Sequence, residues 1–138
     1  MLCELAEEEP SNDAASFILQ RARHHFLVLN IYPYNTGHLM IVPYQHVGRL
    51  SALPAGAIAE MFDLATRVER VLEEVYRPEG INLGMNLGRC AGAGIADHLH
   101  LHVVPRWSGD TSFMTVSGAT RVLPEDLTAT WNKLQGRF

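Results

Sequence analysis

Three histidines separated by single leucines, His98, His100 and His102, constrain the local fold more than any other feature of this chain. Successive side chains of a β-strand point to opposite faces, so the three imidazoles share one face of an extended segment. The intervening Leu99 and Leu101 then face a hydrophobic core. On an α-helix the same histidines would scatter over more than half of the circumference. The pattern therefore predicts a half-buried strand that presents a row of imidazoles.

The composition is that of a single globular domain of 138 residues, with 47% hydrophobic residues and a formal net charge of −4 at pH 7. The acidic balance argues against a broad surface for duplex nucleic acid. No segment approaches the roughly 18 apolar residues of a membrane span, and the first residues lack a signal-peptide pattern. Cys3 and Cys90 form no disulfide framework, so we expect a cytoplasmic protein. Residues 1–13 are acidic and turn-rich and are expected to be flexible, ahead of one domain over residues 14–138.

Apolar runs and turn residues predict an α+β fold. A helix is expected from Pro54 to Tyr76, where apolar residues recur at steps of three and four, with Ser51 as a candidate cap. Its predicted buried face consists of Ile58, Met61, Phe62, Ala65, Val68, Leu72, Val75 and Tyr76. Strands are expected at residues 17–20, 25–31, 38–43, 81–88, 98–105 and 113–116, and a second helix at 124–134. Strands in neighbouring runs favour an antiparallel sheet of about five strands.

The histidine row leaves two chemical interpretations open, because imidazole can act as acid, base, nucleophile or metal ligand near neutral pH. A zinc site would need a further ligand, for which Cys3, His38 and His46 are the candidates. Nucleophilic attack on phosphorus would need one ring nitrogen to hold its proton against an acceptor, which leaves the other nitrogen its lone pair.

The loop before the histidines favours phosphorus chemistry. Residues 86–94 read Asn-Leu-Gly-Arg-Cys-Ala-Gly-Ala-Gly, and small residues allow backbone N–H groups to approach an anion closely. The loop matches neither a Walker loop nor a dinucleotide-binding fingerprint. Beside three imidazoles, it is interpreted as a phosphate-binding loop.

These motifs resemble those of the histidine triad (HIT) superfamily. Residues 98–104 fit its pattern of three histidines alternating with apolar residues. Leu29–Pro43 is similar to the family's strand–turn–strand entry, and Asn86–Trp107 to the branch of bacterial diadenosine polyphosphate hydrolases and phosphorylases. The resemblance runs from about Phe17 to Met114. It implies a HIT-like fold and a homodimer whose sheets join edge to edge.

The resemblance also implies roles for individual residues. His100 matches the nucleophile that attacks the α-phosphate of a nucleotide and forms a covalent nucleotidyl–histidine intermediate, which water or phosphate then resolves. His98, His102 and His38 match the residues that orient and polarise the site. The implied substrate-binding residues are Asn30 at the ribose, Ile31 at the base, Asn86 with Gly92 and Gly94 at the phosphates, and Trp107 at the second nucleoside.

Two departures from the family pattern bear on substrate and metal. The loop before the triad carries no Ser or Thr in the run from Gly92 to Gly94, so backbone N–H groups must replace a hydroxyl donor. Cys3, His46 and His98 match only part of the zinc-binding set that some bacterial members carry, so we expect no tightly held structural zinc. No cofactor is expected to be required, and Mg²⁺ is the ion that could accompany the substrate.

The resemblance favours cleavage of dinucleoside polyphosphates such as diadenosine tetraphosphate. Three alternatives stay open at this point. The first is a nucleoside phosphoramidate or adenylyl-monophosphate hydrolase, which would share the nucleophile and differ in the leaving group. The second is a metalloenzyme with zinc on the triad, and the third is a nucleotide-sensing module without turnover.

Overall fold

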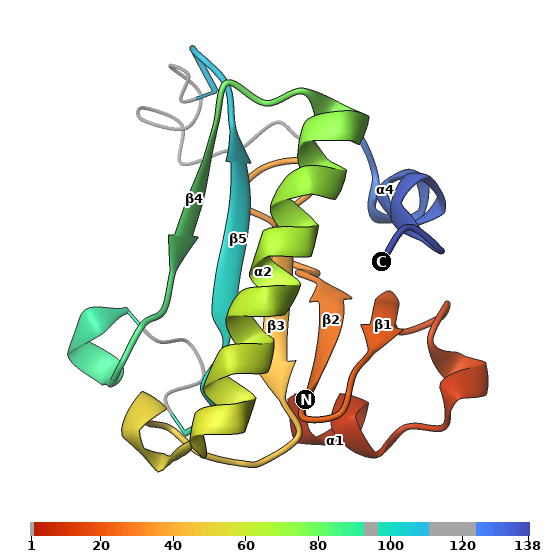
Figure 1. Cartoon of the computed structure of the whole chain (residues 1–138). Helices are drawn as coiled ribbons and strands as arrows, with labels where there is room; N and C mark the ends of the chain where they lie inside the picture. The colour runs from red at the N-terminus through yellow and green to blue at the C-terminus, as the bar shows by residue number, and fades with distance from the viewer. Residues whose placement is uncertain (1, 93–96, 111–123) are drawn as a thin grey trace.

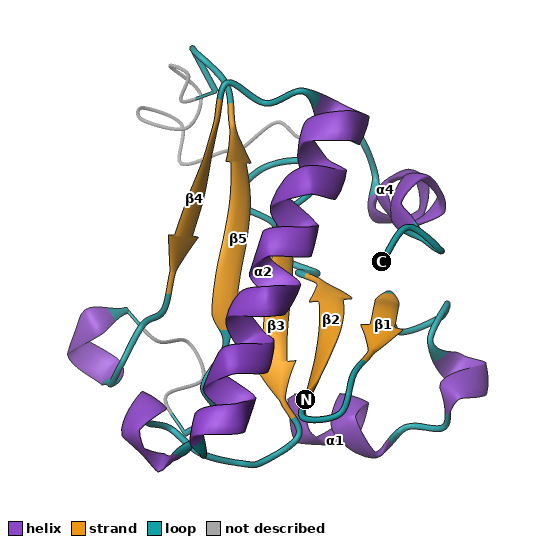
Figure 2. Ribbon diagram, in the orientation of Figure 1, coloured by secondary structure: helices purple, strands orange, loops and turns teal. Residues whose placement is uncertain are grey.

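The fold is one antiparallel sheet crossed by a long helix, in a computed structural model that describes residues 2–92, 97–110 and 124–138. The strand order in the sheet is β1-β2-β3-β5-β4, and each neighbouring pair is antiparallel (Figures 1 and 2). The strands are β1 (Ile18–Arg21), β2 (His25–Leu29), β3 (Leu39–Pro43), β4 (Gly80–Gly84) and β5 (Leu101–Arg106). The described helices are α1 (Leu2–Glu7), α2 (Ala55–Tyr76) and α4 (Leu127–Leu134). The predicted α+β class is confirmed, and the strand expected at 113–116 lies outside the described residues.

The sheet separates two hydrophobic clusters. Alternation along β2 sends Leu27 and Leu29 into the larger cluster, between the sheet and α2, and sends Phe26 and Val28 into the smaller one on the opposite face. Helix α1 contributes Leu2 to the smaller cluster. The site described below lies on the face opposite α2, because the leucines that alternate with the triad belong to the larger cluster.

The prediction for the long helix is correct in extent and wrong in two details. Phe62 is 50% exposed, whereas Leu64, absent from the predicted face, is buried. Phe62 follows the fully buried Met61 by one residue, and one residue turns an α-helix by about 100°, away from the sheet. Ser51 does not cap the helix, because it lies in a 3-10 turn (Leu50–Ala52) and Pro54 holds the N-cap position.

Strand boundaries differ from the prediction at the edges of the site. β5 begins at Leu101 rather than at His98, so the first two histidines precede the regular strand. The alternation nevertheless continues through them, because Leu99 is buried in the α2 cluster together with Leu101 and Val103. β4 ends at Gly84 rather than at residue 88, and the chain continues into a 3-10 turn (Arg89–Ala91).

The first residues of the chain carry more regular structure than expected, and the last helix is shorter than expected. Residues 1–13 include α1, whose Leu2 is buried, and Asp13 pairs with Arg21 at 2.8 Å between Oδ1 and Nη2. The flexibility of this segment and the domain boundary after it stay predictions. α4 begins at Leu127 because Asp126 caps it by accepting a hydrogen bond from the Ala129 N–H (2.8 Å).

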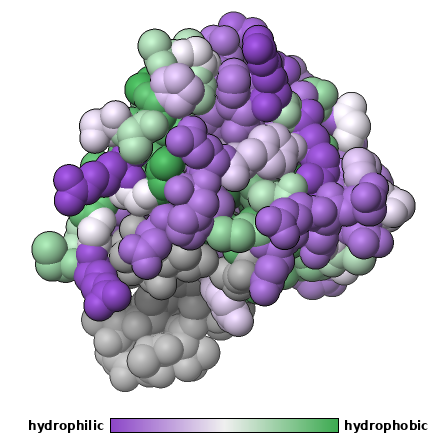
Figure 3. All heavy atoms as spheres, turned by 90° about the horizontal axis from the view of Figure 1, so that it is seen from below, coloured by the Kyte–Doolittle hydropathy of each residue, from purple (hydrophilic) through white to green (hydrophobic). Residues whose placement is uncertain are grey.

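The outer surface is mixed in character. The face in Figure 3 is mainly hydrophilic, with hydrophobic residues interspersed among the charged and polar ones. Among the described helices, none combines the length and the apolar character that crossing a membrane requires.

Candidate active site

Hydrogen bonds fix the ring orientation of the first two triad histidines. His100 Nδ1–H donates to the carbonyl oxygen of His98 at 2.9 Å, and His98 Nε2–H donates to the carbonyl oxygen of Pro43 at 2.8 Å. A carbonyl can only accept, so each of these nitrogens carries a proton. In the neutral imidazole of His100 the lone pair is therefore on Nε2. This is the arrangement that a nucleophilic imidazole needs.

A second chain of hydrogen bonds sets the proton on His102. The backbone N–H of Tyr34 donates to His38 Nδ1 at 3.0 Å, so the proton of neutral His38 lies on Nε2. His38 Nε2–H then donates to His102 Nδ1 at 2.9 Å. This leaves the Nε2–H of His102 as a donor, and its ring lies 4.6 Å from that of His100 between centroids. The site thus pairs a nitrogen that carries a lone pair with a neighbouring N–H donor.

The turn before β3 places His38 for this role. Gly37 has φ +75°, a left-handed conformation that L side chains rarely adopt. A Cβ there would also lie 3.3 Å from Pro105 and from Tyr76. Asn30, directly after β2, adds support, because its Nδ2 lies 3.3 Å from His38 Nδ1 and its Oδ1 accepts from the Tyr32 N–H at 3.0 Å.

The surroundings of His98 and His102 lower the pKa of both rings and so favour their neutral forms. Burial, together with the neighbouring His100, lowers the pKa of His102 to about 4. Burial also lowers the pKa of His98, and the nearby imidazoles of His46 and His100 act in the same direction. In the neutral form His98 and His102 each keep one nitrogen as a donor and the other as an acceptor.

A potential metal-binding group lies at the start of the triad. Cys3 Sγ lies 3.0 Å from His46 Nδ1 and 3.3 Å from His98 Nδ1, and the three donor atoms all lie within 4.8 Å of one another. Structural zinc sites use four protein ligands, so these residues supply three of the four positions. His46 and His98 lie 43 and 95 positions after Cys3 in the sequence. They meet Cys3 here because α1 packs against the triad face.

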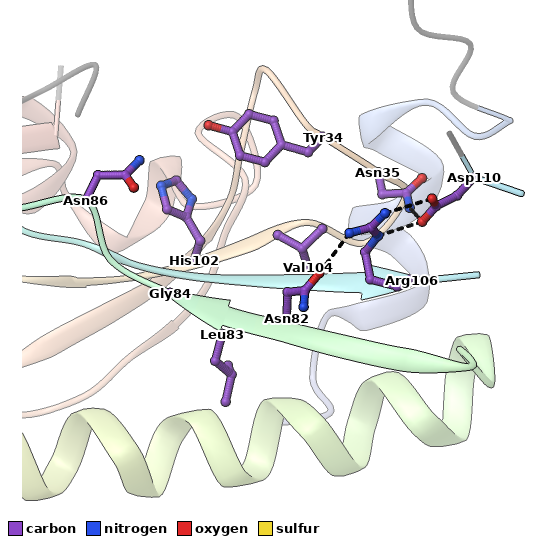
Figure 4. A pocket seen from close by; sticks show the side chains of 10 residues that line it. All are labelled: Tyr34, Asn35, Asn82, Leu83, Gly84, Asn86, His102, Val104, Arg106 and Asp110. Carbon is purple, nitrogen blue, oxygen red and sulfur yellow. Dashed lines mark hydrogen bonds and ion pairs between the residues drawn. The ribbon is translucent and has the colours of Figure 1, made fainter. Parts of the chain in front are cut away.

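A pocket of about 320 Å³ opens beside His102 on the triad face, over β4 and β5 (Figure 4). Tyr34, Asn86 and His102 surround one end of it, and Arg106 lies at the other end. Leu83 points to the opposite side of the sheet, toward α2. The nucleophilic geometry of the triad therefore adjoins a space that can receive a ligand.

The residues predicted to bind substrate are distributed around the triad. Asn30 is buried beside His38, and Ile31 is 43% exposed in the following turn. Asn86 lines the pocket, and its Nδ2 donates to the Gly92 carbonyl at 3.3 Å, across the predicted phosphate-binding loop. Gly92 has φ +87°. Trp107 is not among the residues that line the pocket, and Gly94 lies outside the described residues.

Comparison with known proteins identifies the family. A family model described as the HIT domain matches residues 11–109. The chain belongs to the HIT domain family. A Mycobacterium tuberculosis HIT relative named AP-4-A phosphorylase is 45% identical over 83% of this chain and 58% of its own length. A bis(5'-nucleosyl)-tetraphosphatase (asymmetrical) from Schizosaccharomyces pombe is 29% identical over 70% of this chain and 53% of its own length. The chain therefore spans somewhat more than half the length of these relatives.

The fold comparison agrees with the family. A crystal structure of a Zn-bound histidine triad family protein from Mycobacterium smegmatis superimposes with a TM-score of 0.75 and 28% identity. The match covers 99% of this chain and 90% of that chain. The resemblance inferred from the triad motif is thereby confirmed for both family and fold.

Sequence reasoning missed several residues of the site. Tyr34 packs at a tilt against two histidines, with its ring centroid 4.6 Å from that of His38 and 5.7 Å from that of His102. Asn82 and Arg106 line the pocket and bond to each other at 2.8 Å between Oδ1 and Nη1. The period-two pattern carries a signal for Arg106, since it lies four residues beyond His102 and therefore on the same face of the strand.

Proposed function

We propose that this chain transfers a nucleotidyl group from a dinucleoside polyphosphate, such as diadenosine tetraphosphate, to phosphate or water. The observation that carries the proposal is the fixed orientation of His100, whose Nδ1–H is held by the His98 carbonyl so that Nε2 keeps its lone pair. The names of the M. tuberculosis and S. pombe relatives support this substrate class.

The chemistry follows from the positions of the two rings. His100 Nε2 attacks the α-phosphorus, a P–N bond forms, and the P–O bond to the rest of the polyphosphate breaks. The bridging oxygen leaves with the bond electrons as part of a nucleoside polyphosphate. Phosphate or water then displaces the imidazole and returns it to its starting state. His102 Nε2–H stabilises negative charge on the phosphate oxygens, and His38 keeps that proton in place.

The remaining predicted residues have supporting positions. Exposed Ile31 adjoins buried Asn30, which suits a base and a ribose on the β2 side of the triad. Asn86 lies at the pocket end nearest His102, which suits contact with a phosphate. A phosphate-binding role for Gly92 and Gly94 stays part of the proposal. A role for Trp107 at the second nucleoside finds no support in the lining of the pocket.

A substrate panel tests the proposal. Diadenosine tetraphosphate is expected to yield ADP and ATP in the presence of phosphate by phosphorolysis, or AMP and ATP in its absence by hydrolysis. The 45% identity to a relative named AP-4-A phosphorylase favours phosphate as the acceptor. Turnover of a nucleoside phosphoramidate without cleavage of any dinucleoside polyphosphate would contradict the proposed substrate class.

The zinc-compatible group plays no part in this reaction scheme. Zinc in the M. smegmatis structure and the three donors Cys3, His46 and His98 are compatible with a metal that fixes α1 to the triad segment. Such an ion would supply structural cross-linking. Because one ligand of four is absent from the described set, we predict that zinc binds weakly. We also expect the enzymatic activity to survive complete chelation. Metal content by mass spectrometry and turnover, each measured before and after chelation, test the two expectations.

A homodimer is the assembly we propose. In the described sheet β4 pairs with β5 alone, and its residues are largely exposed, including Leu83 at 49%. An edge strand of this kind presents unpaired N–H and C=O groups to another chain. Sedimentation is expected to give twice the chain mass, and a monomer at micromolar concentration would contradict the proposal.

A further inference from the structure

The turn between β2 and β3 supplies the backbone group that sets the proton on His38. The Tyr34 N–H donates to His38 Nδ1 at 3.0 Å, and the His38 N–H donates to the Asn35 carbonyl oxygen at 3.2 Å. Asn30 Nδ2 lies 3.3 Å from the same ring nitrogen and assists from the end of β2. The position of the turn therefore decides whether His38 Nδ1 keeps its backbone donor and the proton stays on Nε2.

The side chain of Asn35 fastens this turn to the end of β5. Its Nδ2 donates to the Pro105 carbonyl oxygen at 3.1 Å and to Asp110 Oδ2 at 2.8 Å. A carbonyl and a carboxylate can only accept, so both hydrogens of the Asn35 amide are used within the protein. In Figure 4, Asn35 and Asp110 lie together beside Arg106 at the end of β5. The turn is thus attached to the strand that carries His102.

Arg106 and the loop after β5 orient the carboxylate that receives Asn35. Arg106 Nε donates to Asp110 Oδ2 at 2.6 Å and its Nη2 donates to Oδ1 at 2.8 Å, while the Trp107 N–H donates to Oδ2 at 3.3 Å. The guanidinium above all holds the pKa of Asp110 well below its usual range, so the carboxylate stays ionised. An ionised acceptor strengthens the hydrogen bond from Asn35. Because the side chain of Arg106 is 44% exposed, the ion pair itself contributes little to stability.

Loss of the Asn35 contacts would reverse the chain of proton donors behind the triad. Without the Tyr34 N–H at Nδ1, neutral His38 can hold its proton on Nδ1 and keep a lone pair on Nε2. That lone pair faces His102 Nδ1 at 2.9 Å, so His102 must then place its own proton on Nδ1. Its Nε2 becomes an acceptor and no longer donates to a phosphate oxygen. A change at Asn35 would thus reach the phosphate through two imidazoles.

We infer that Asn35, held by Asp110 and the Pro105 carbonyl, is a positioning residue that fixes the tautomers of His38 and His102. Both amide hydrogens of Asn35 are engaged in the protein, so its action is on the turn and not on a ligand. The catalytic consequence rests on the proposed function, in which His102 donates to the phosphate. The tautomers themselves can be measured without any substrate.

Nitrogen NMR of the histidine rings tests the inference directly. Protein labelled with ¹⁵N in histidine is measured at neutral pH, where the His102 ring is unprotonated because its pKa is about 4. Substitution of each ring in turn assigns its signals. The unmodified protein should show protons on Nε2 of both His38 and His102. In Asn35→Ala the form with protons on both Nδ1 atoms should become the majority, and the two rings should change together.

Steady-state kinetics with diadenosine tetraphosphate measures the consequence. The kcat of Asn35→Ala should fall about fivefold, in proportion to the remaining Nε2-protonated form, and KM should stay within twofold. Asp110→Asn should act in the same direction. It should add little to Asn35→Ala in the double variant, because both substitutions disrupt one contact.

Asp13→Asn is the matched control. Asp13 receives Nε and Nη2 of Arg21 at 3.0 Å and 2.8 Å, as Asp110 receives those of Arg106, but this pair lies at the β1 edge of the sheet. The control should leave the ring signals and kcat unchanged. Thermal unfolding verifies that each variant is folded. If Asn35→Ala does not fold, Asn35→Asp provides the same test, because it has nearly the same shape and cannot donate.

Two results would overturn the inference. One is a folded Asn35 variant in which both rings keep their protons on Nε2, whatever its kcat, because the residue then does not set the tautomers. The other is an equal change of the ring signals in Asp13→Asn, which would make the effect a general one. A shift of the tautomers with unchanged kcat would uphold the positioning role and contradict the part given to His102 in the proposed function. If the unmodified protein cleaves no dinucleoside polyphosphate, the proposed function fails and the NMR result still decides the inference.

Discussion

The two faces of the triad segment use alternate residues for different purposes. Leu99, Leu101 and Val103 are buried in the hydrophobic cluster between the sheet and α2. On the other face, His100 and His102 are held by hydrogen bonds to the His98 carbonyl and to His38. One face therefore contributes to stability by area removed from water, and the other orients nitrogen atoms. Because the faces alternate, a substitution can disturb one without the other.

The largest expected effect is on catalysis. Replacing His100 by Asn removes the nitrogen that carries the lone pair, and turnover of diadenosine tetraphosphate should fall by about three orders of magnitude or more. The midpoint of thermal unfolding should change little, because His100 belongs to neither hydrophobic cluster. Steady-state kinetics and calorimetry on the same preparation measure the two quantities. Near-normal turnover would show that another group is the nucleophile.

The matching change on the opposite face should act on stability. Leu101 is 3% exposed, and Leu101→Ala removes buried methyl groups and leaves a cavity, which costs about 3 kcal/mol of unfolding free energy. At a temperature where the variant is fully folded, kcat should stay within a few-fold of the unmodified protein. Urea titration and kinetics test the pair of expectations. A variant that keeps its stability and loses activity would contradict the division between the faces.

The smallest effect is a pH dependence on the histidine face. The pKa of His102 is about 4 in the folded protein and about 6.5 when exposed, so the unfolded chain binds a proton that the folded one excludes. Stability from this group is complete above pH 6.5 and is lost as the pH falls toward 4, by at most roughly 3 kcal/mol. His102→Asn should reduce the slope of unfolding free energy against pH in this window. A slope unchanged by the substitution would mean that the folded ring titrates normally.

Local patterns predicted the features that depend on side-chain periodicity. Alternation fixed which residues of the triad segment face the core, and the steps of three and four from Met61 to Leu72 located α2. Periodicity failed where adjacent residues are both apolar. The steps of three and four also include Phe62, which lies four residues after Ile58 and three before Ala65, yet the helical turn directs it outward.

Contacts between distant segments could not be predicted from local patterns. His25 is fully buried and its Nδ1 lies 2.9 Å from Glu60 Oε1, a pair joined only when β2 packs against α2. The bond between Asn35 and Asp110 likewise brings together loops 75 residues apart. The family resemblance predicts the catalytic roles of the histidines, and these roles stay a proposal. The pocket beside His102 could not be predicted from local patterns either, because it forms only when β4 packs against β5.

The covalent intermediate provides the most direct test of the central claim. Unmodified protein is mixed with diadenosine tetraphosphate, quenched rapidly without acid because phosphorus–nitrogen bonds to imidazole are acid-labile, and analysed by intact-mass and peptide mass spectrometry. The account predicts one adenylyl group per chain, located on His100 and absent from the His100→Asn protein. An adenylyl group on a different residue, or the same adduct in His100→Asn, would contradict it.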